Sequence, residues 1–162
     1  MNYRYSIANY IWHLNGHPVY GMPMAYLDPD RLRHPDAAVD AYDDDLPVLV
    51  GRKFRTVVSL VNRRQQRVLE NAGFEFHAVL IPDGEAPTLL QVEEYRKIVE
   101  ACPKPMVVHC EGGVGRTGTM LALYLIFQGV ENAEAIRQVR KSLPTAIETS
   151  AQERFLLGYQ PG

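Results

Sequence analysis

Residues 109–118 read HCEGGVGRTG, and this stretch decides the fold. It follows the apolar run Met106–His109, typical of a short buried strand, and precedes an apolar segment to about Gln128, typical of a central helix. A turn from a buried strand into a helix N-terminus directs backbone N–H groups at one point, where the helix dipole adds positive charge. Gly112, Gly113 and Gly115 within the turn allow close backbone approach to an anion. The turn therefore predicts a phosphate cradle.

Two side chains of this turn predict chemistry as well as binding. Cys110 lies at its mouth, where the N–H groups and a nearby arginine stabilise a thiolate and so activate it as a nucleophile. Arg116 ends the turn, and its planar guanidinium is suited to grip two phosphate oxygens and to stabilise the transition state. A lone cysteine would be read as structural. Cysteine preceded by His109, and followed six positions later by arginine, is far more specific.

The remaining residues of the turn have supporting roles in this interpretation. His109 is expected to be structural and to fix the shape of the loop by bonding within it. Thr117 is placed to donate its hydroxyl to the cysteine sulfur when that sulfur leaves as a thiolate. We expect the phosphate to be held by the loop residues Glu111, Gly112, Gly113, Val114, Gly115 and Arg116.

Strands and helices alternate from residue 53 onward. Residues 54–61 and 74–81 are predicted as strands, and residues 62–72 as a helix ended by Gly73. Residues 19–22 are predicted as a further short strand. This alternation indicates an α/β fold: a single domain with a twisted, mostly parallel central sheet of four to five strands flanked by helices.

Helix starts are marked by polar capping residues. Thr88 with Gln91, and Thr149 with Gln152, have the spacing of capping boxes, and Asn132 is predicted to cap a helix between them. The N-terminal third has weaker signals. Residues 29–42 are predicted as a helix interrupted at Pro35, and residues 43–45, three aspartates, as a solvated loop.

Composition limits the class of protein. The chain has 162 residues, 46% of them apolar, which fits one globular domain over 1–162. Its net charge of -2 argues against a nucleic-acid partner. Cys102 and Cys110 are separated by an extended stretch too long for a disulfide, and two free thiols point to a reducing compartment. The longest apolar stretch, residues 120–127, is too short to span a bilayer, and we see no signal peptide. We expect a cytoplasmic monomer without a membrane partner.

The pattern His-Cys, five residues, then Arg-Thr-Gly resembles the phosphate-binding loop of the cysteine-dependent protein tyrosine phosphatase superfamily, and in particular its small dual-specificity members. The resemblance covers most of residues 50–157, including residues 81–83, 118–122 and 146–149. Residues 1–45 match only loosely, so we expect a catalytic core at about 46–160.

The resemblance implies that Asp83 is the general acid. The residues permit this role independently, because a leaving oxygen needs a proton and Asp83 lies in a Pro-Asp-Gly turn at the C-terminal end of a predicted strand. Glu85 is the competing carboxylate. Glu148 and Gln152 match a segment near the pocket, where a polar side chain positions the hydrolytic water; Glu148 alternatively supports the last helix.

The expected function is hydrolysis of phosphomonoesters, namely phosphotyrosine and also phosphoserine and phosphothreonine in proteins or peptides, through a cysteinyl-phosphate. The mechanism requires no metal or other cofactor. Alternatives are an inositol-phosphate or RNA 5′-phosphatase of the same superfamily and, less favoured, a non-catalytic phosphate-binding module or a sulfur transferase. Arg63 and Arg64 follow a predicted strand and either contact an anionic substrate or begin a solvated helix.

Overall fold

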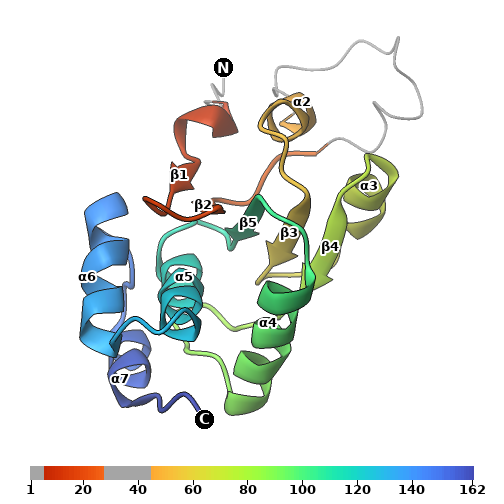
Figure 1. The fold of residues 1–162 in the computed structure, drawn as a ribbon. Coiled ribbons are helices and arrows are strands. Elements are labelled where there is room, and N and C mark those ends of the chain that lie inside the picture. The colour runs from red at the N-terminus through yellow and green to blue at the C-terminus, as the bar shows by residue number, and fades with distance from the viewer. Residues whose placement is uncertain (1–5, 28–44) are drawn as a thin grey trace, which may run out of the picture.

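The computed structural model describes residues 6–27 and 45–162, with a five-stranded sheet through the centre (Figure 1). The strand order is β1-β2-β5-β3-β4. All neighbouring pairs are parallel except β1 and β2, which are antiparallel. The predicted α/β fold with a mostly parallel sheet is therefore confirmed. The strands are β1 (Trp12–His13), β2 (Val19–Met22), β3 (Thr56–Ser59), β4 (Glu75–Ala78) and β5 (Met106–His109).

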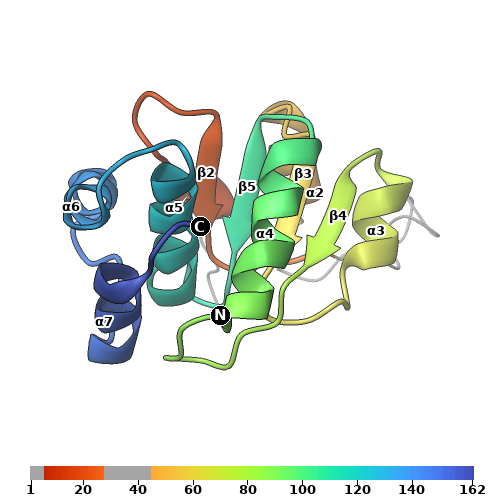
Figure 2. The same ribbon diagram turned by 60° about the horizontal axis from the view of Figure 1, so that its bottom comes forward.

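Helices cover both faces of the sheet (Figure 2). One face carries α4 and α5, and α6 and α7 pack against α5. The other face carries α2 and α3, together with the 3-10 helix η1 (Ile7–Asn9). The helices are α2 (Leu46–Gly51), α3 (Gln66–Asn71), α4 (Leu89–Ala101), α5 (Gly115–Phe127), α6 (Asn132–Ser142) and α7 (Ser150–Gly158).

The central strands divide their side chains between two cores. Val57 of β3 and Val107 of β5 belong to the core on the α2 and α3 face. Their neighbours Val58 and Val108 belong to the core on the α4 and α5 face. This alternation is the period of two expected of a strand covered on both faces. Helix α5 is buried from Gly115 to Ile126, as the apolar residues on all of its sides predict.

Several boundaries differ from the sequence prediction, and local hydrogen bonds explain them. The strands are shorter than residues 54–61 and 74–81. Helix α3 starts at Gln66 and not at residue 62, because the Ser59 hydroxyl donates to the Asn62 carbonyl and forms a turn there. The cap of α6 is Glu131, whose carboxylate accepts from two backbone N–H groups. Asn132 instead donates to carbonyls near the end of α7.

Asp45 corrects another expectation. It is buried and accepts hydrogen bonds from the backbone N–H groups of Ile7 and Tyr26, so it ties two N-terminal segments to α2 and is not part of a solvated loop. The helix predicted over residues 29–42 lies outside the described residues. Both capping boxes, at Thr88 and at Thr149, are confirmed.

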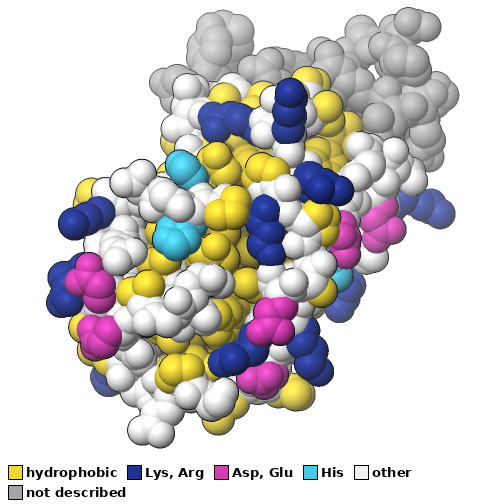
Figure 3. All heavy atoms as spheres, in the orientation of Figure 1, with side chains coloured by type: hydrophobic (Ala, Val, Ile, Leu, Met, Phe, Trp, Pro, Cys, Tyr) yellow, Lys and Arg dark blue, Asp and Glu magenta, His cyan; other side chains and the backbone are white. Residues whose placement is uncertain are grey.

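Basic and acidic side chains are interspersed on the face shown in Figure 3, with apolar side chains between them. Within residues 6–27 and 45–162, no helix is long and apolar enough to cross a bilayer.

Candidate active site

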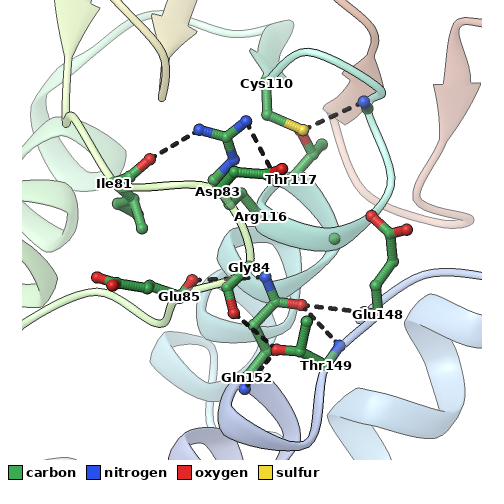
Figure 4. Close-up of polar contacts among 12 residues, drawn as sticks. Ile81, Asp83, Gly84, Glu85, Cys110, Arg116, Thr117, Glu148, Thr149 and Gln152 are labelled. Atoms are coloured by element: carbon green, nitrogen blue, oxygen red, sulfur yellow. Dashed lines mark hydrogen bonds and ion pairs between the residues drawn. The ribbon is translucent and has the colours of Figure 1, made fainter.

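The loop between β5 and α5 surrounds the sulfur of Cys110. This cysteine is 3% exposed and follows the C-terminal end of β5 directly. Its Sγ accepts hydrogen bonds of 3.1 Å from the backbone N–H of Gly113 and from the hydroxyl of Thr117 (Figure 4). Helix α5 begins at Gly115, so the sulfur lies near the positive end of a buried 13-residue helix. This arrangement favours negative charge on the sulfur.

Arg116 lies in the first turn of α5 and is 6% exposed. Its Nη1 donates to the carbonyl of Ile81 at 2.7 Å, and its Nη2 lies 3.6 Å from Oδ1 of Asp83. The guanidinium thus connects the cysteine loop to the loop that follows β4 (Figure 4). The Nε of Arg116 is buried and has no hydrogen-bond partner among the described residues. A buried cationic N–H donor of this kind is suited to bind an anion.

The N-terminal segment supports the cysteine loop from outside. The Trp12 indole donates to the Gly113 carbonyl at 2.9 Å, and the Met24 N–H donates to the Glu111 carbonyl at 3.0 Å. Gly113 has a φ of +76°, and a Cβ there would lie 2.4 Å from the carbonyl carbon of Met22. Only glycine fits so close to β2. Trp12 and Met24 were not predicted as site residues, since nothing local in residues 6–27 indicates these contacts.

His109 is buried beside the cysteine. Its Nδ1–H donates to the carbonyl of Cys110 at 3.2 Å, and its Nε2 has no partner in the described part of the chain. Burial lowers the pKa of His109 to about 4; the nearby Arg116 lowers it as well, whereas the hydrogen bond to Cys110 opposes the shift. The imidazole is therefore neutral at physiological pH and adds no charge to the site.

The predicted acid, Asp83, lies on an exposed turn that faces the cysteine loop. Its side chain is 89% exposed and forms the ion pair with Arg116 described above. Gly84 follows with a φ of +79°, and its carbonyl accepts a 2.8 Å hydrogen bond from the hydroxyl of Thr149. In Figure 4 the Glu85 carboxylate points away from Cys110. The geometry thus brings Asp83, and not Glu85, to the arginine.

Glu148 and Gln152 lie against the start of α5. A Cβ on Gly115 would lie 2.6 Å from Oε1 of Glu148 and 3.3 Å from the amide of Gln152. The Gln152 Oε1 accepts from the N–H groups of Glu148 and Thr149, and its Nε2 donates to the Glu85 carbonyl at 3.4 Å. Gln152 therefore connects the start of α7 to the loop that carries Asp83.

Arg63 and Arg64 are exposed in the turn between β3 and α3. The Arg64 N–H donates to the side chain of Asn62 at 3.0 Å, which indicates a local turn.

The segment that precedes α7 is held by Arg140, which donates to the carbonyls of Ala146 and Ile147 and pairs with Glu153. Arg140 was not expected from the sequence; its contacts cross from α6 to the next helix.

Comparison with known proteins gives consistent matches. A family model described as "Polymorphic toxin system, DSP-PTPase phosphatase" matches residues 34–130. The dual specificity protein phosphatase CDC14B of Mus musculus is 31% identical over 114 residues, 69% of this chain and 23% of that protein. The tyrosine-protein phosphatase CDC14 homolog of Schizosaccharomyces pombe is 27% identical over 139 residues, 84% of this chain and 25% of that protein. The chain thus spans about a quarter of the length of these relatives.

Solved structures extend the match to most of the chain. The crystal structure of Tk-PTP in the active form is 28% identical and superposes with a TM-score of 0.66, covering 90% of this chain and 92% of that one. The kinase associated phosphatase, crystallised with its catalytic-site cysteine replaced by serine, superposes with a TM-score of 0.67 at 18% identity, covering 88% of each chain. This second likeness shows the shared fold.

Proposed function

The chain belongs to the DSP-PTPase phosphatase family, and we propose that it hydrolyses phosphomonoesters of proteins or peptides through a cysteinyl-phosphate intermediate. One observation carries the proposal: the Cys110 sulfur accepts hydrogen bonds from Gly113 and Thr117 at the N-terminus of α5. The hydrogen bonds and the helix terminus stabilise a thiolate at this position. The same N–H groups at the helix terminus are suited to bind the phosphate that the thiolate attacks.

In the first step, the Cys110 sulfur attacks phosphorus as the bond to the leaving oxygen breaks, and Asp83 donates its proton to that oxygen. Arg116 and the N–H groups of loop 111–115 hold the equatorial oxygens and stabilise their charge. The 3.6 Å separation of Asp83 and Arg116 supports this assignment, because the acid and the phosphate ligand must act on one substrate.

In the second step, water attacks the cysteinyl-phosphate and Asp83, now a carboxylate, accepts its proton. The sulfur leaves as a thiolate, and the Thr117 hydroxyl, 3.1 Å from it, stabilises the charge. Glu148 is proposed to orient the water, because its carboxylate lies against Gly115 at the edge of the loop. Gln152 holds the neighbouring backbone in place and is proposed to act through that contact.

We propose activity on phosphoserine and phosphothreonine as well as phosphotyrosine. The 89% exposure of Asp83 supports a pocket open enough for short side chains to reach Cys110. We also propose that residues 1–162 form one domain, with the core at 46–160 completed by β2. The pairing of β2 with the central strand β5 supports this. We further propose that the enzyme is a cytoplasmic monomer that binds neither nucleic acid nor membranes.

A substrate panel tests this function. Phosphotyrosine, phosphoserine and phosphothreonine peptides, inositol phosphates, RNA with a 5′-triphosphate and thiosulfate are assayed with the wild type, Cys110→Ser and Arg116→Lys. We expect phosphate release from the peptides, no turnover by Cys110→Ser, and severe loss in Arg116→Lys, whose ammonium cannot form two parallel hydrogen bonds. Turnover of inositol phosphates or RNA alone would reassign the substrate. Activity of Cys110→Ser within tenfold of the wild type would exclude a cysteine nucleophile.

A further inference from the structure

Three potential metal ligands converge at the edge of the sheet remote from the candidate active site. Glu75 and His77 are two positions apart on β4 and therefore point to the same face of the sheet. Cys102, the residue that ends α4, lies over them on that face. The Cys102 Sγ is 3.1 Å from Nε2 of His77 and 3.5 Å from Oε1 of Glu75, and the last two atoms are 3.2 Å apart.

These three separations match one face of a coordination tetrahedron. Zinc binds sulfur at about 2.3 Å and nitrogen or carboxylate oxygen at about 2.1 Å. Tetrahedral angles then place sulfur roughly 3.6 Å from each of the other two atoms, and place those two roughly 3.4 Å from each other. The observed edges of 3.1, 3.5 and 3.2 Å are each within about 0.5 Å of these values. Small side-chain rotations suffice to reach them.

The chemistry of the three groups selects the cation. A thiolate with an imidazole suits a borderline-soft ion, whereas magnesium and calcium prefer oxygen ligands alone. Cys102 is 6% exposed, while the side chains of His77 and Glu75 are 33% and 47% exposed. The sulfur thus lies at the buried side and the other two ligands at the solvent side. An ion can enter from solvent and keep a water as its fourth ligand.

We propose that Glu75, His77 and Cys102 form a tetrahedral zinc site, with solvent as the fourth ligand. Acidic and histidine side chains meet over β4 on the right of Figure 3, where the site opens to solvent. Zinc replaces the thiol proton, which passes to solvent. The ion links β4 to the end of α4, two elements that the sheet itself does not connect.

The position of the site makes its role structural. Glu75 is in register with Met106 at the N-terminal end of β5, because both pair with Thr56, whereas Cys110 follows the C-terminal end of that strand. The length of β5 therefore separates the ion from the proposed chemistry. The strand it secures, β4, is at the edge of the sheet and pairs with β3 alone in the described region. Zinc should raise the unfolding temperature and leave turnover unchanged.

Cobalt binding to the Cys110→Ser protein tests the proposal. The chain has two cysteines, so in this variant a thiolate-to-cobalt charge-transfer band can arise only from Cys102. We expect the band to saturate at one equivalent of Co²⁺ and to be displaced by Zn²⁺ but not by Mg²⁺. Adding His77→Ala or Glu75→Gln should weaken binding at least about tenfold. Both side chains are partly exposed, so both variants should keep the fold.

Glu94→Gln in the same Cys110→Ser protein is the matched control, because Glu94 is an exposed carboxylate in the middle of α4. It should leave cobalt affinity unchanged. The proposal is overturned if no charge-transfer band forms. It is equally overturned if the band persists with unchanged affinity in both His77→Ala and Glu75→Gln, since the sulfur would then bind metal without these two ligands.

Discussion

The hydroxyl of Thr149 donates a 2.8 Å hydrogen bond to the carbonyl oxygen of Gly84, the residue after the proposed acid. The same hydroxyl oxygen accepts the N–H of Gln152 and so caps α7. One side chain therefore starts the last helix and holds the loop of Asp83. Because a general acid must lie within reach of its leaving group, this contact should affect catalysis.

Thr149→Ala should slow turnover of poor leaving groups about tenfold, by loosening the Asp83 loop. It should also cost roughly 1 kcal/mol of unfolding free energy through loss of the cap. Thr149→Ser, which keeps the hydroxyl, should restore both. Steady-state kinetics with leaving groups of different acidity separate the effects, because a stability defect alone would slow all esters equally. Equal slowing would contradict the positioning role.

Gly113→Ala should damage both folding and activity. Its backbone is in the left-handed region, and the new methyl group would collide with the backbone of Met22. We expect a loss of about 2–4 kcal/mol in unfolding free energy, measured by urea denaturation, with a larger loss of turnover. Gly112→Ala is the matched control, because a Cβ there meets no atom within 4 Å. Similar stabilities for the two variants would mean that the contact with β2 is not a constraint.

Hydrogen peroxide should inactivate the enzyme through Cys110, and a thiol reductant should restore it. A sulfur stabilised as a thiolate is the form that peroxide oxidises. In the metal-free protein, burial, followed by the carboxylate of Glu75, raises the pKa of Cys102 to about 11, so this thiol should react slowly. Cys102→Ser should therefore inactivate at the wild-type rate, followed as residual activity over time. If Cys102→Ser protects the enzyme from peroxide, then Cys102 and not Cys110 is the sensitive thiol.

The pH dependence of stability should report the buried His109. Its folded-state pKa of about 4 lies below the ordinary value of 6.5. Between these values the unfolded chain binds a proton that the folded protein does not, so unfolding free energy should fall as pH drops from 6.5 to about 4. The loss from this group is at most about 3 kcal/mol. In His109→Asn, unfolding free energy should fall less steeply as pH drops from 6.5 to about 4, which denaturation curves recorded across that range would measure. If the pH dependence of unfolding free energy is the same as in the wild type, another group is responsible.

How far the sequence predicted the structure depended on whether the information was local. The strand Met106–His109 and the capping boxes at Thr88 and Thr149 were predicted correctly, because each is a pattern of neighbouring residues. The cap of α6 was placed one residue late, at Asn132, because the chain offers two polar residues there and only packing against α7 decides between them.

The contacts that support the candidate site could not be predicted in this way. Trp12 bonds to Gly113 across 101 positions, and Thr149 to Gly84 across 65. Such contacts depend on strand order, and no local pattern states that β2 lies beside β5. The proposed roles of Cys110, Arg116 and Asp83 came from residue types and resemblance, and they stay predictions until variants are assayed.

The role of Asp83 can be tested through its leaving groups. A general acid matters in proportion to how much the leaving oxygen needs a proton, and typically contributes ~10²–10⁴-fold. Asp83→Asn should therefore strongly slow hydrolysis of alkyl and tyrosyl phosphates. It should slow an activated aryl ester much less, since that phenol leaves unassisted.

Glu85→Gln is the control for Asp83→Asn. The backbone carbonyl of Glu85 accepts a hydrogen bond from Gln152, and the Glu85 carboxylate points away from Cys110 in Figure 4. Replacing this carboxylate by an amide should therefore change turnover little. Asp83→Asn also removes the ion pair that holds Arg116 in place, and this loss would weaken phosphate binding. That effect would raise KM for every ester alike, whereas loss of the acid lowers kcat only where the leaving group is poor. If Asp83→Asn harms good and poor leaving groups equally, Asp83 acts through Arg116 and is not the acid. If Glu85→Gln gives the leaving-group dependence instead, the acid lies two residues later.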